Sequence, residues 1–399
     1  MKIFALFLAL IQGSKMFFPR RMSTTDWQKD SFKKIQQLFS SQSGLFSDKK
    51  MTISKAFNRY SDEHEARMKQ VFADFKHEFD KHWSPEEEKL RLGIFGENVK
   101  KIWEHNSLNS KTFEMAINEF SDLTDQEFQS QYTPLPLPVI QNPKGTPPPL
   151  IEGLEKPKRL LQTSNPSSVS EILSSLPKKV DWAFQGKVSP IKHQKNCQGC
   201  YVFSALAALE SAIAIRYNTM IPLSEQELID CSYSYRNGGC RGGQPQFVFD
   251  YIIANGANLE ENYLFTSREG QCKAPTYKGV FKLLRKYFKP EPNVISLIQY
   301  LQYGPVVVNH YIPPDFKYYF QGIYSTPQCG NVKEINHSSI VVGYDLESPK
   351  PFFKLKNSWG LKWGEDGFYK VHIGELSFDN PGFCSMANNG YNVFPTLFE

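Results

Sequence analysis

The sequence predicts an α+β fold in which a helical part precedes a part rich in short β-strands. Residues 201–217 are apolar on nearly every side, which is typical of a helix buried in the middle of a domain. Beyond about residue 275 the pattern changes to short β-rich runs with glycine and proline between them, such as residues 305–308 and 339–342. A helical half followed by a sheet half indicates two subdomains.

Residues 1–14 have the pattern of a secretory signal peptide. Lys2 precedes a short apolar run, residues 3–11, and small or polar residues follow it. A core strand or a membrane anchor is the alternative, but the run is too short to span a bilayer. No later stretch is expected to be apolar enough to cross a membrane, so we expect no membrane association of the mature form. Residues 15–55 show no convincing periodicity and stay unassigned.

Residues 56–130 are predicted to be helical. Aromatic residues recur there at helical spacing: Phe72, Phe75, Phe79 and Trp83. A charged, strongly helical stretch, residues 86–109, follows Ser84 and Pro85. Proline at a first helical position after serine is a start signal for a helix.

Residues 131–175 are rich in proline, which breaks helices and favours extended chain. We therefore expect an extended segment there. Regular structure resumes near Leu176, and residues 176–399 are predicted to form the main domain. Within that domain, residues 224–227 (SEQE) read as a capping box that opens a second helix.

Composition narrows the class of protein. Of 399 residues 40% are hydrophobic, enough for a sizeable core, and the net charge of +5 is too weak and diffuse to indicate a nucleic-acid partner. All seven cysteines lie in the second half of the chain. An odd count in a secreted protein leaves one thiol over, so six can form disulfides and one can react.

Cys200 is the candidate nucleophile. It lies at the first turn of the buried helix, where the helix dipole favours the thiolate, the nucleophilic form. Cys197 and Cys200 could instead form a redox pair, or half of a metal site with His193. The redox alternative needs a βαβ context, and the metal alternative needs a second ligand pair. We see neither in the sequence, and we expect no metal and no cofactor.

A cysteine nucleophile needs a base and a residue that orients the base. His337 and then Asn357 follow well downstream, and cysteine, histidine and asparagine in this order are typical of the papain and cathepsin group. Taken alone, a histidine such as His337 is more often an ordinary core residue. Residues 176–399 resemble the catalytic domain of papain-family cysteine peptidases throughout. Further matching segments are residues 223–231 (LSEQELIDC), 240–243 (CRGG), 357–360 (NSWG) and 363–364 (WG).

The preceding region resembles the family's inhibitory propeptide, in a cathepsin-L-like form. Six residues fall at the spacing of its helical motif: Glu87, Arg91, Phe95, Asn98, Ile102 and Asn106. Residues 118–122 (NEFSD) resemble its second motif, with Ala116 where glycine is usual. The resemblance implies a papain-like fold with a helical left subdomain and a β-barrel-like right subdomain, preceded by a helical propeptide at residues 56–130.

The resemblance also implies a role for each site residue. Cys200 would attack the scissile carbonyl, and His337 would hold the thiolate as an ion pair and protonate the leaving amine. Asn357 would orient the imidazole. The side chain of Gln194 and the backbone N–H of Cys200 would form the oxyanion hole, and Trp359 would shield the Asn357–His337 hydrogen bond from water. The implied disulfides are Cys197–Cys240, Cys231–Cys272 and Cys329–Cys384.

Three residues near the thiol depart from the family pattern. Lys195 and Gln198 stand where glycine is usual, and Tyr201 replaces tryptophan. Side chains at the first two positions could narrow the S1 region or strain the loop. Every catalytic group is still in place, so activity is expected.

The resemblance further implies a set of residues lining the substrate cleft: Gly242, Gly243, Gln244, Pro245, Asn309, Ile335, Asn336, Trp359 and Asn389. The implied S2 pocket is more polar than one for a bulky apolar P2 residue, so we expect weaker selection for leucine or phenylalanine there. Residues 336–338 (NHS) form a glycosylation sequon. A glycan beside the catalytic histidine would obstruct the cleft, so we expect this sequon to be unused.

The sequence thus predicts a cysteine-type endopeptidase made as a zymogen, since no long insertion blocks either end of the expected cleft. Its partners would be protein and peptide substrates and its own propeptide, and we expect a monomer. The predicted location is the secretory pathway, ending in a lysosome or vacuole or outside the cell. The alternative is a catalytically silent papain-fold binding protein, which the changes at residues 195 and 198 would favour.

Overall fold

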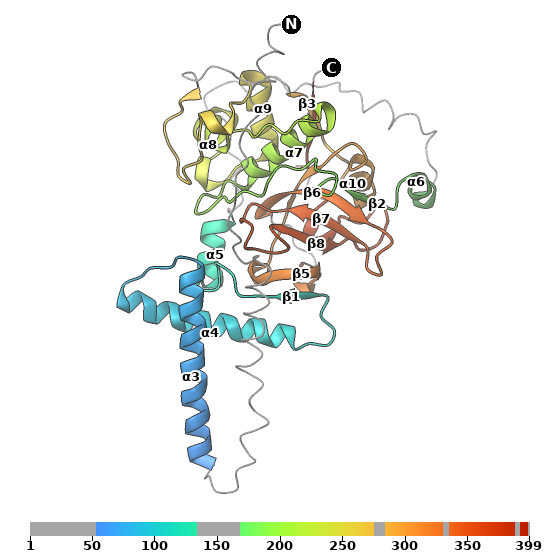
Figure 1. Ribbon diagram of the computed structural model, residues 1–399. Helices are drawn as coiled ribbons and strands as arrows, with labels where there is room; N and C mark the ends of the chain where they lie inside the picture. Colours follow the sequence, from blue (N-terminus) through green and yellow to red (C-terminus); the bar gives the residue numbers. More distant parts are fainter. Residues whose placement is uncertain (1–52, 134–167, 275–283, 330–334, 388–391, 398–399) are drawn as a thin grey trace, which may run out of the picture.

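The computed structural model describes residues 53–133, 168–274, 284–329, 335–387 and 392–397. The predicted signal peptide, most of the unassigned N-terminal extension and most of the proline-rich segment lie outside these ranges. Figure 1 shows the N-terminal helices as a separate layer below a larger body that combines helices and a sheet.

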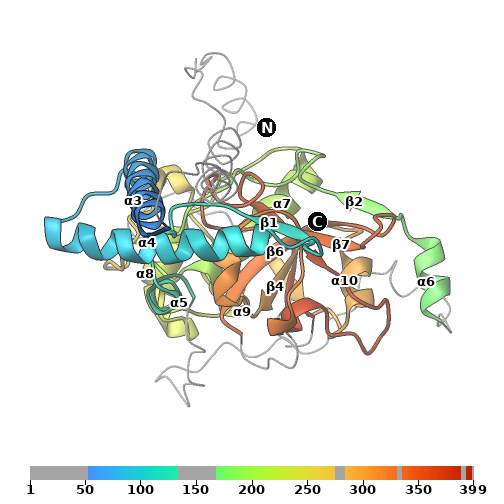
Figure 2. The same ribbon diagram turned by 90° about the horizontal axis from the view of Figure 1, so that it is seen from below.

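The N-terminal layer contains α3 (Ile53–Glu78), α4 (Pro85–Asn106), β1 (Phe113–Met115) and α5 (Asp125–Tyr132). The start signal predicted for α4 is confirmed: Ser84 is the N-cap, its hydroxyl accepts a hydrogen bond from the N–H of Glu87, and Pro85 opens the helix. The strand β1 was not predicted, and the region expected to be helical is interrupted there. Figure 2, seen from below, shows α4 crossing the view with β1 near its C-terminal end, where Asn106 bonds to Met115.

The larger body begins with short elements and then forms a helical subdomain. Its elements are α6 (Val169–Ser175), β2 (Lys179–Asp181), α7 (Cys200–Tyr217), α8 (Glu225–Cys231) and α9 (Pro245–Asn255). The predicted central helix is confirmed as α7. Among the described residues, α7 is also long and apolar enough to cross a membrane, which corrects the expectation that no such stretch follows the N-terminal run. Because 78% of it is buried inside the protein, α7 serves here as a core helix.

The capping box predicted at the start of α8 is only half right. The hydroxyl of Ser224 accepts from the N–H of Glu227, as expected. The N–H of Ser224, however, donates to the carbonyl of Asn258. The Glu227 carboxylate instead accepts from the N–H of Asn258 and the hydroxyl of Tyr251. Tertiary partners have thus replaced the local contact.

The sheet subdomain is built from strands that lie far apart in sequence. They are β3 (Leu284–Phe288), β4 (Val306–His310), β5 (Tyr319–Tyr324), β6 (His337–Asp345), β7 (Phe352–Lys356), β8 (Phe368–His372) and β9 (Phe394–Leu397), with the helix α10 (Val294–Tyr300). The main sheet has the order β1-β5-β8-β7-β6-β2, with β4 also paired to β6, and β3 pairs with β9. The two predicted β-rich runs are confirmed as parts of β4 and β6.

The N-terminal layer completes this sheet. Strand β1 pairs antiparallel with β5, with Phe113 opposite Gly322. Gly322 has a φ of +95°, and a Cβ atom there would lie 2.7 Å from the carbonyl oxygen of Thr112, so only glycine permits this close approach. Buried side chains of the layer and of the sheet belong to one hydrophobic core, whereas a second core surrounds α7.

Candidate active site

Cys200 is the first residue of α7 and the one free cysteine of the chain. Its thiol is buried, and burial raises the pKa of Cys200 to about 12, although the backbone N–H groups of Ser338, Tyr201 and Cys200 itself act in the opposite direction. In this precursor the thiol is therefore held in its neutral form.

His337 begins β6 and contacts Asn357, which follows β7. The Nε2 atom of His337 lies 2.9 Å from the Oδ1 atom of Asn357. The same oxygen accepts from the N–H of Ser358 at 2.9 Å, which identifies it as the oxygen of the amide. Since this oxygen can only accept, Nε2 of His337 carries the proton and Nδ1 is left with its lone pair.

The Nδ1 atom of His337 is buried and has no hydrogen-bond partner in the structure. No hydrogen bond therefore joins Nδ1 of His337 to Cys200 in this precursor form. Burial also lowers the pKa of His337 to about 4, more than the hydrogen bond to Asn357 raises it. Both shifts favour a neutral thiol beside a neutral imidazole.

Trp359 covers this pair. Its ring centroid lies 5.0 Å from that of His337 and the side chain is fully buried. Phe120 and Phe128 of the N-terminal layer contact the same indole edge to face, at 5.4 and 5.3 Å. The His337–Asn357 hydrogen bond is therefore enclosed by aromatic rings from both parts of the chain.

The side chain of Gln194 is tied to two neighbouring segments. Its Oε1 atom accepts from the hydroxyl of Ser358 at 2.6 Å, and its Nε2 donates to the carbonyl of Cys197 at 3.2 Å. The backbone N–H of Gln194 also donates to the carbonyl of Ser358. These bonds fix the amide close to the head of α7, with Nε2 holding a second hydrogen that another acceptor can take.

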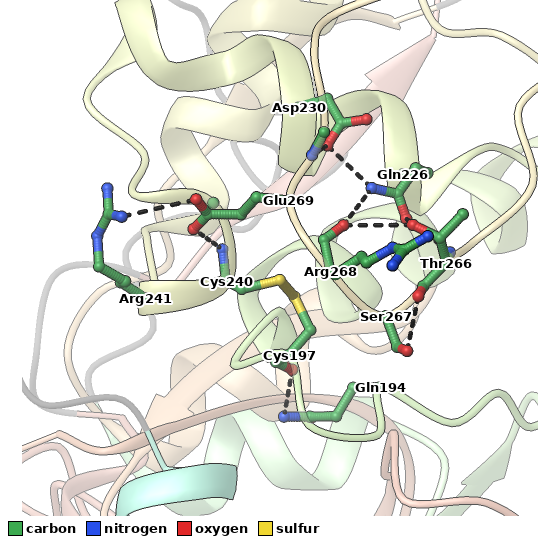
Figure 3. The surroundings of a disulfide bond; sticks show 12 residues. Gln194, Cys197, Gln226, Asp230, Cys240, Arg241, Thr266, Ser267, Arg268 and Glu269 are labelled. Carbon is green, nitrogen blue, oxygen red and sulfur yellow. Dashed lines mark hydrogen bonds and ion pairs between the residues drawn. A yellow bond between two sulfur atoms is a disulfide. The ribbon is translucent and has the colours of Figure 1, made fainter.

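Three disulfides join Cys197 to Cys240, Cys231 to Cys272 and Cys329 to Cys384, the same pairs that the resemblance implied. Figure 3 shows the first of them between Gln194 on one side and Glu269, which accepts from the N–H of Cys240, on the other. Because Cys197 is bonded to Cys240, the redox alternative lacks its second thiol. Among the described residues no cluster of metal-ligating side chains exists either.

The cleft residues expected from the sequence lie on several elements. Gln244 and Pro245 open α9, Asn309 lies on β4 and Ile335 precedes β6, while Asn389 is outside the described residues. Gly242 and Gly243 follow a 3-10 turn, Gly239–Arg241. A Cβ atom on Gly243 would lie 2.4 Å from the Asn237 side chain, so this position requires glycine.

Asn336, the sequon residue, forms hydrogen bonds through both atoms of its side-chain amide. The Nδ2 atom donates to the carbonyl of Ile312 at 3.0 Å, and Oδ1 accepts from the N–H of Ile312 at 2.7 Å. A glycan on Nδ2 would compete with this paired contact, which supports the expectation that the sequon is unused.

The six residues at motif spacing in α4 hold the N-terminal layer together. The Arg91 guanidinium pairs with Glu87 at 2.6 Å and with Glu127 at 2.8 Å. Asn98 donates to the carbonyls of Ser121 and Leu123. The remaining members either bond to β1 or are buried in the core: Asn106, Phe95 and Ile102.

The structure adds contacts that the sequence analysis missed. The two residues that replace glycine near the thiol take part in them. Lys195 has a left-handed φ of 49° and donates its N–H to Nδ1 of His193. The other ring nitrogen of His193 lies 2.9 Å from the Glu119 carboxylate of the N-terminal layer, and the Gln198 side chain donates to the carbonyl of Ser130. No local pattern could reveal these contacts, because their partners lie in another layer of the fold.

Comparison with known proteins places this arrangement in a defined class, a cysteine protease with its inhibitory propeptide attached. Residues 176–393 match the model of the papain family cysteine protease, and residues 72–128 match that of the cathepsin propeptide inhibitor domain. The chain belongs to the papain family of cysteine proteases.

Relatives at similar distance come from animals and plants. Cathepsin Q of Rattus norvegicus is 33% identical over 324 residues, which cover 79% of this chain and 89% of the relative. Cathepsin L-like proteinase of Phaedon cochleariae is 33% identical over 308 residues, covering 76% and 88%. The solved structure of procathepsin L 3 of the Tenebrio molitor larval midgut matches with a TM-score of 0.67 at 28% identity, covering 83% of this chain and 99% of that one. These matches confirm the predicted papain-like α+β fold with a propeptide.

Proposed function

We propose that the mature protein is a cysteine endopeptidase in which Cys200 is the nucleophile and His337 its base. The observation that carries this proposal is the hydrogen bond from His337 Nε2 to Asn357 at 2.9 Å, which leaves Nδ1 as the one basic atom of the ring. In the reaction, Nδ1 takes the proton of the Cys200 thiol, and the sulfur adds to the carbonyl carbon of the scissile bond. The imidazolium then gives that proton to the leaving amine, and water hydrolyses the acyl-enzyme.

Oxyanion stabilisation is assigned to Gln194 and to the backbone N–H of Cys200. The fixed amide of Gln194 and the N-terminal turn of α7 can both donate to an oxygen that gains negative charge. Gln194 is fully buried and held by three bonds, so little reorganisation is needed during the reaction.

We propose that the N-terminal layer, called the propeptide layer from here on, keeps the enzyme inactive. Phe120 and Phe128 close over Trp359, and burial holds Cys200 and His337 in their neutral forms. Removing the layer readmits water, which stabilises the thiolate–imidazolium pair. We place the inhibitory domain at residues 56–130, the extended segment at 131–175 and the peptidase domain at 176–399, with cleavage near Leu176.

Papain-family precursors with disulfides are typically proteins of the secretory pathway, and this chain fits that pattern. We propose that residues 1–14 are its signal peptide, followed by an extension at residues 15–55. We further propose that the mature enzyme is a monomer that acts on proteins and peptides in a lysosome or vacuole or outside the cell.

The specificity proposal rests on Gln244, Asn309, Ile335 and Asn389, with Pro245, as lining of the S2 pocket. Since three of these five residues carry polar amide side chains, we expect a peptide library to show broad P2 selection. A profile dominated by one large aliphatic P2 residue would contradict it.

The test of the function is active-site labelling of the acid-processed protein with a fluorescent epoxide probe. The cysteine protease of Carica candamarcensis, 34% identical with a TM-score of 0.50, was solved in complex with E-64. We expect labelling on Cys200 that abolishes peptide hydrolysis, and no labelling of Cys200→Ser. A folded, processed protein that takes up no probe would instead favour the silent binding protein.

A further inference from the structure

A second buried histidine, His310, lies beside His337 and has no part in the mechanism above. His310 on β4 and His337 on β6 are directly opposite each other in the antiparallel register. Side chains at such paired positions project from the same face of the sheet. The two ring centroids are 5.6 Å apart and the ring planes are nearly perpendicular, at 87°.

Both ring nitrogens of His310 have partners. Nδ1 lies 3.3 Å from the backbone carbonyl of Tyr311, and Nε2 lies 2.9 Å from the hydroxyl of Tyr369 on β8. A carbonyl can only accept, so Nδ1 carries the proton and Nε2 accepts from the Tyr369 hydroxyl. His310 is thereby fixed in one tautomer and one orientation.

The two neighbouring histidines therefore differ in what they can do. His337 has one nitrogen without a partner, whereas His310 has none to offer to a proton from Cys200. Protonating His310 would reverse its bond with Tyr369, whose hydroxyl would then have to accept, and would place a second cation against the His337 imidazolium.

The ionisable groups facing His310 agree with a neutral ring. His337 of β6 and Tyr369 of β8 contact it. The helix α7, which also packs on β4, carries the titratable residues Cys200, Tyr201, Glu210, Arg216 and Tyr217. The other packed elements, β9 and the 3-10 turn at Phe383–Ser385, contribute no titrating side chain. Burial, followed by repulsion from His337, lowers the pKa of His310 to about 3.

We propose that His310 is a positioning residue for His337: it is held neutral by Tyr369, limits rotation of the catalytic ring and supports its imidazolium form. This inference rests on the proposed role of His337. A fixed polar ring solvates a neighbouring cation better than an aliphatic side chain would. Trp359 contacts the His337 ring as well, at 5.0 Å, so the base is held by two aromatic neighbours.

The test uses the full chain, activated and titrated with the epoxide probe so that rates refer to active sites. In His310→Leu we expect kcat to fall roughly tenfold with KM within about twofold, because His310 positions the base without touching substrate. The alkaline limb of the pH profile of kcat/KM, which reports loss of the His337 proton, should move to lower pH by roughly half a unit. Tyr369→Phe should lower kcat and shift the alkaline limb in the same direction, but by smaller amounts, because the His310 ring stays and loses only its hydrogen bond from Tyr369.

Two further variants separate positioning from mere packing. His310→Gln can donate to the Tyr311 carbonyl and accept from Tyr369, so it should restore most of kcat and of the alkaline limb. Tyr344→Phe removes another tyrosine hydroxyl of the same sheet. Tyr344 lies on β6, and its hydroxyl donates to the carbonyl of Pro177. This variant should lower stability without moving the limb.

The proposal is overturned if His310→Leu, or Tyr369→Phe where the leucine variant does not fold, leaves kcat and the alkaline limb at wild-type values. Failure of the proposed function looks different, because the wild-type protein itself would then take up no probe.

Discussion

The propeptide layer holds the two sides of the active site in different ways. Toward the sheet subdomain it adds a strand, β1, to β5 and packs aromatic rings, such as Phe113 against Tyr324 at 4.6 Å. Toward the nucleophile loop, residues 193–199 before Cys200, it makes polar contacts: Glu119 with His193, Tyr132 with Asn196 and the carbonyl of Ser130 with the Gln198 side chain. Strand pairing and apolar burial do not depend on ionisation, whereas one of the three loop contacts, Glu119 with His193, does. We therefore expect the contacts with the sheet subdomain to contribute most of the free energy that holds the propeptide layer in place.

Even the charged contacts follow this division. On the sheet side the ammonium of Lys317, 0% exposed, pairs with Asp125, 42% exposed, at 2.9 Å and donates to the carbonyl of Leu123. On the loop side His193 and Glu119 are 26% and 23% exposed. Removing Asp125 would leave the buried Lys317 ammonium without its counter-ion, whereas His193 and Glu119 are both partly exposed and water can solvate either one when their contact breaks.

The largest effect is expected for Phe120→Ala. Phe120 is fully buried and contacts Phe128, Tyr132 and Trp359. Removing a buried phenyl ring costs about 3 kcal/mol or more, so opening of the layer should become roughly a hundredfold more frequent. Hydrogen exchange of the α5 and β1 amides in a Cys200→Ser precursor measures this directly.

Phe184→Ala is the matched control, because Phe184 is 90% exposed and should leave this exchange unchanged. If Phe120→Ala also exchanged at the wild-type rate, the sheet side would not be what holds the layer.

The sequence allowed prediction of features that depend on local pattern. The start of α4 at Ser84 and Pro85, the buried helix α7 and the runs in β4 and β6 all followed from spacing and turn chemistry. The papain-family resemblance placed Cys200, His337 and Asn357 in their roles as expectations.

Features that depend on distant partners could not be predicted. The strand β1 exists because β5 offers an edge, and Gly322 opposite it gives no local signal of that pairing. The Glu227 side chain accepts a hydrogen bond from the N–H of Asn258 and does not form the predicted contact with the N–H of Ser224. His310 attracted no notice, because its meaning comes from lying opposite His337 on another strand.

An intermediate effect, dependent on pH, is expected for Glu127→Gln. Glu127 joins α5 to α4, and its hydrogen bond with Arg91 lowers the pKa of Glu127 from 4.5 to about 2. Because the folded pKa is below the unfolded value, the contact stabilises the layer fully above about pH 4.5 and is lost as the pH falls toward 2. The free energy of unfolding of the variant should be lower than that of the wild type by about 1 kcal/mol near neutral pH and by little near pH 2.

Thermal unfolding of the Cys200→Ser precursor between pH 7 and pH 2 measures this difference. Glu88→Gln is the control, since Glu88 pairs with Lys76 at an exposed site within the same layer. Equal melting-temperature differences at both ends of the pH range would show that the Arg91–Glu127 pair does not carry the acid sensitivity.

The smallest effect is expected for Glu119→Gln, on the loop side. The amide can still accept from Nε2 of His193 at the place where the carboxylate now lies 2.9 Å away, so only the charge is lost. A contact of this exposure stabilises the closed precursor by about 0.5 kcal/mol. That energy corresponds to a roughly two- to threefold change in an equilibrium constant, so labelling of the intact precursor by the epoxide probe at neutral pH should rise by only that factor. Glu114→Gln is the matched change on the strand side, where Glu114 accepts from Gln321, and it should alter labelling no more. If Glu119→Gln instead opened the precursor as far as Phe120→Ala, the nucleophile loop would be the main attachment of the propeptide and the division between the two sides would fail.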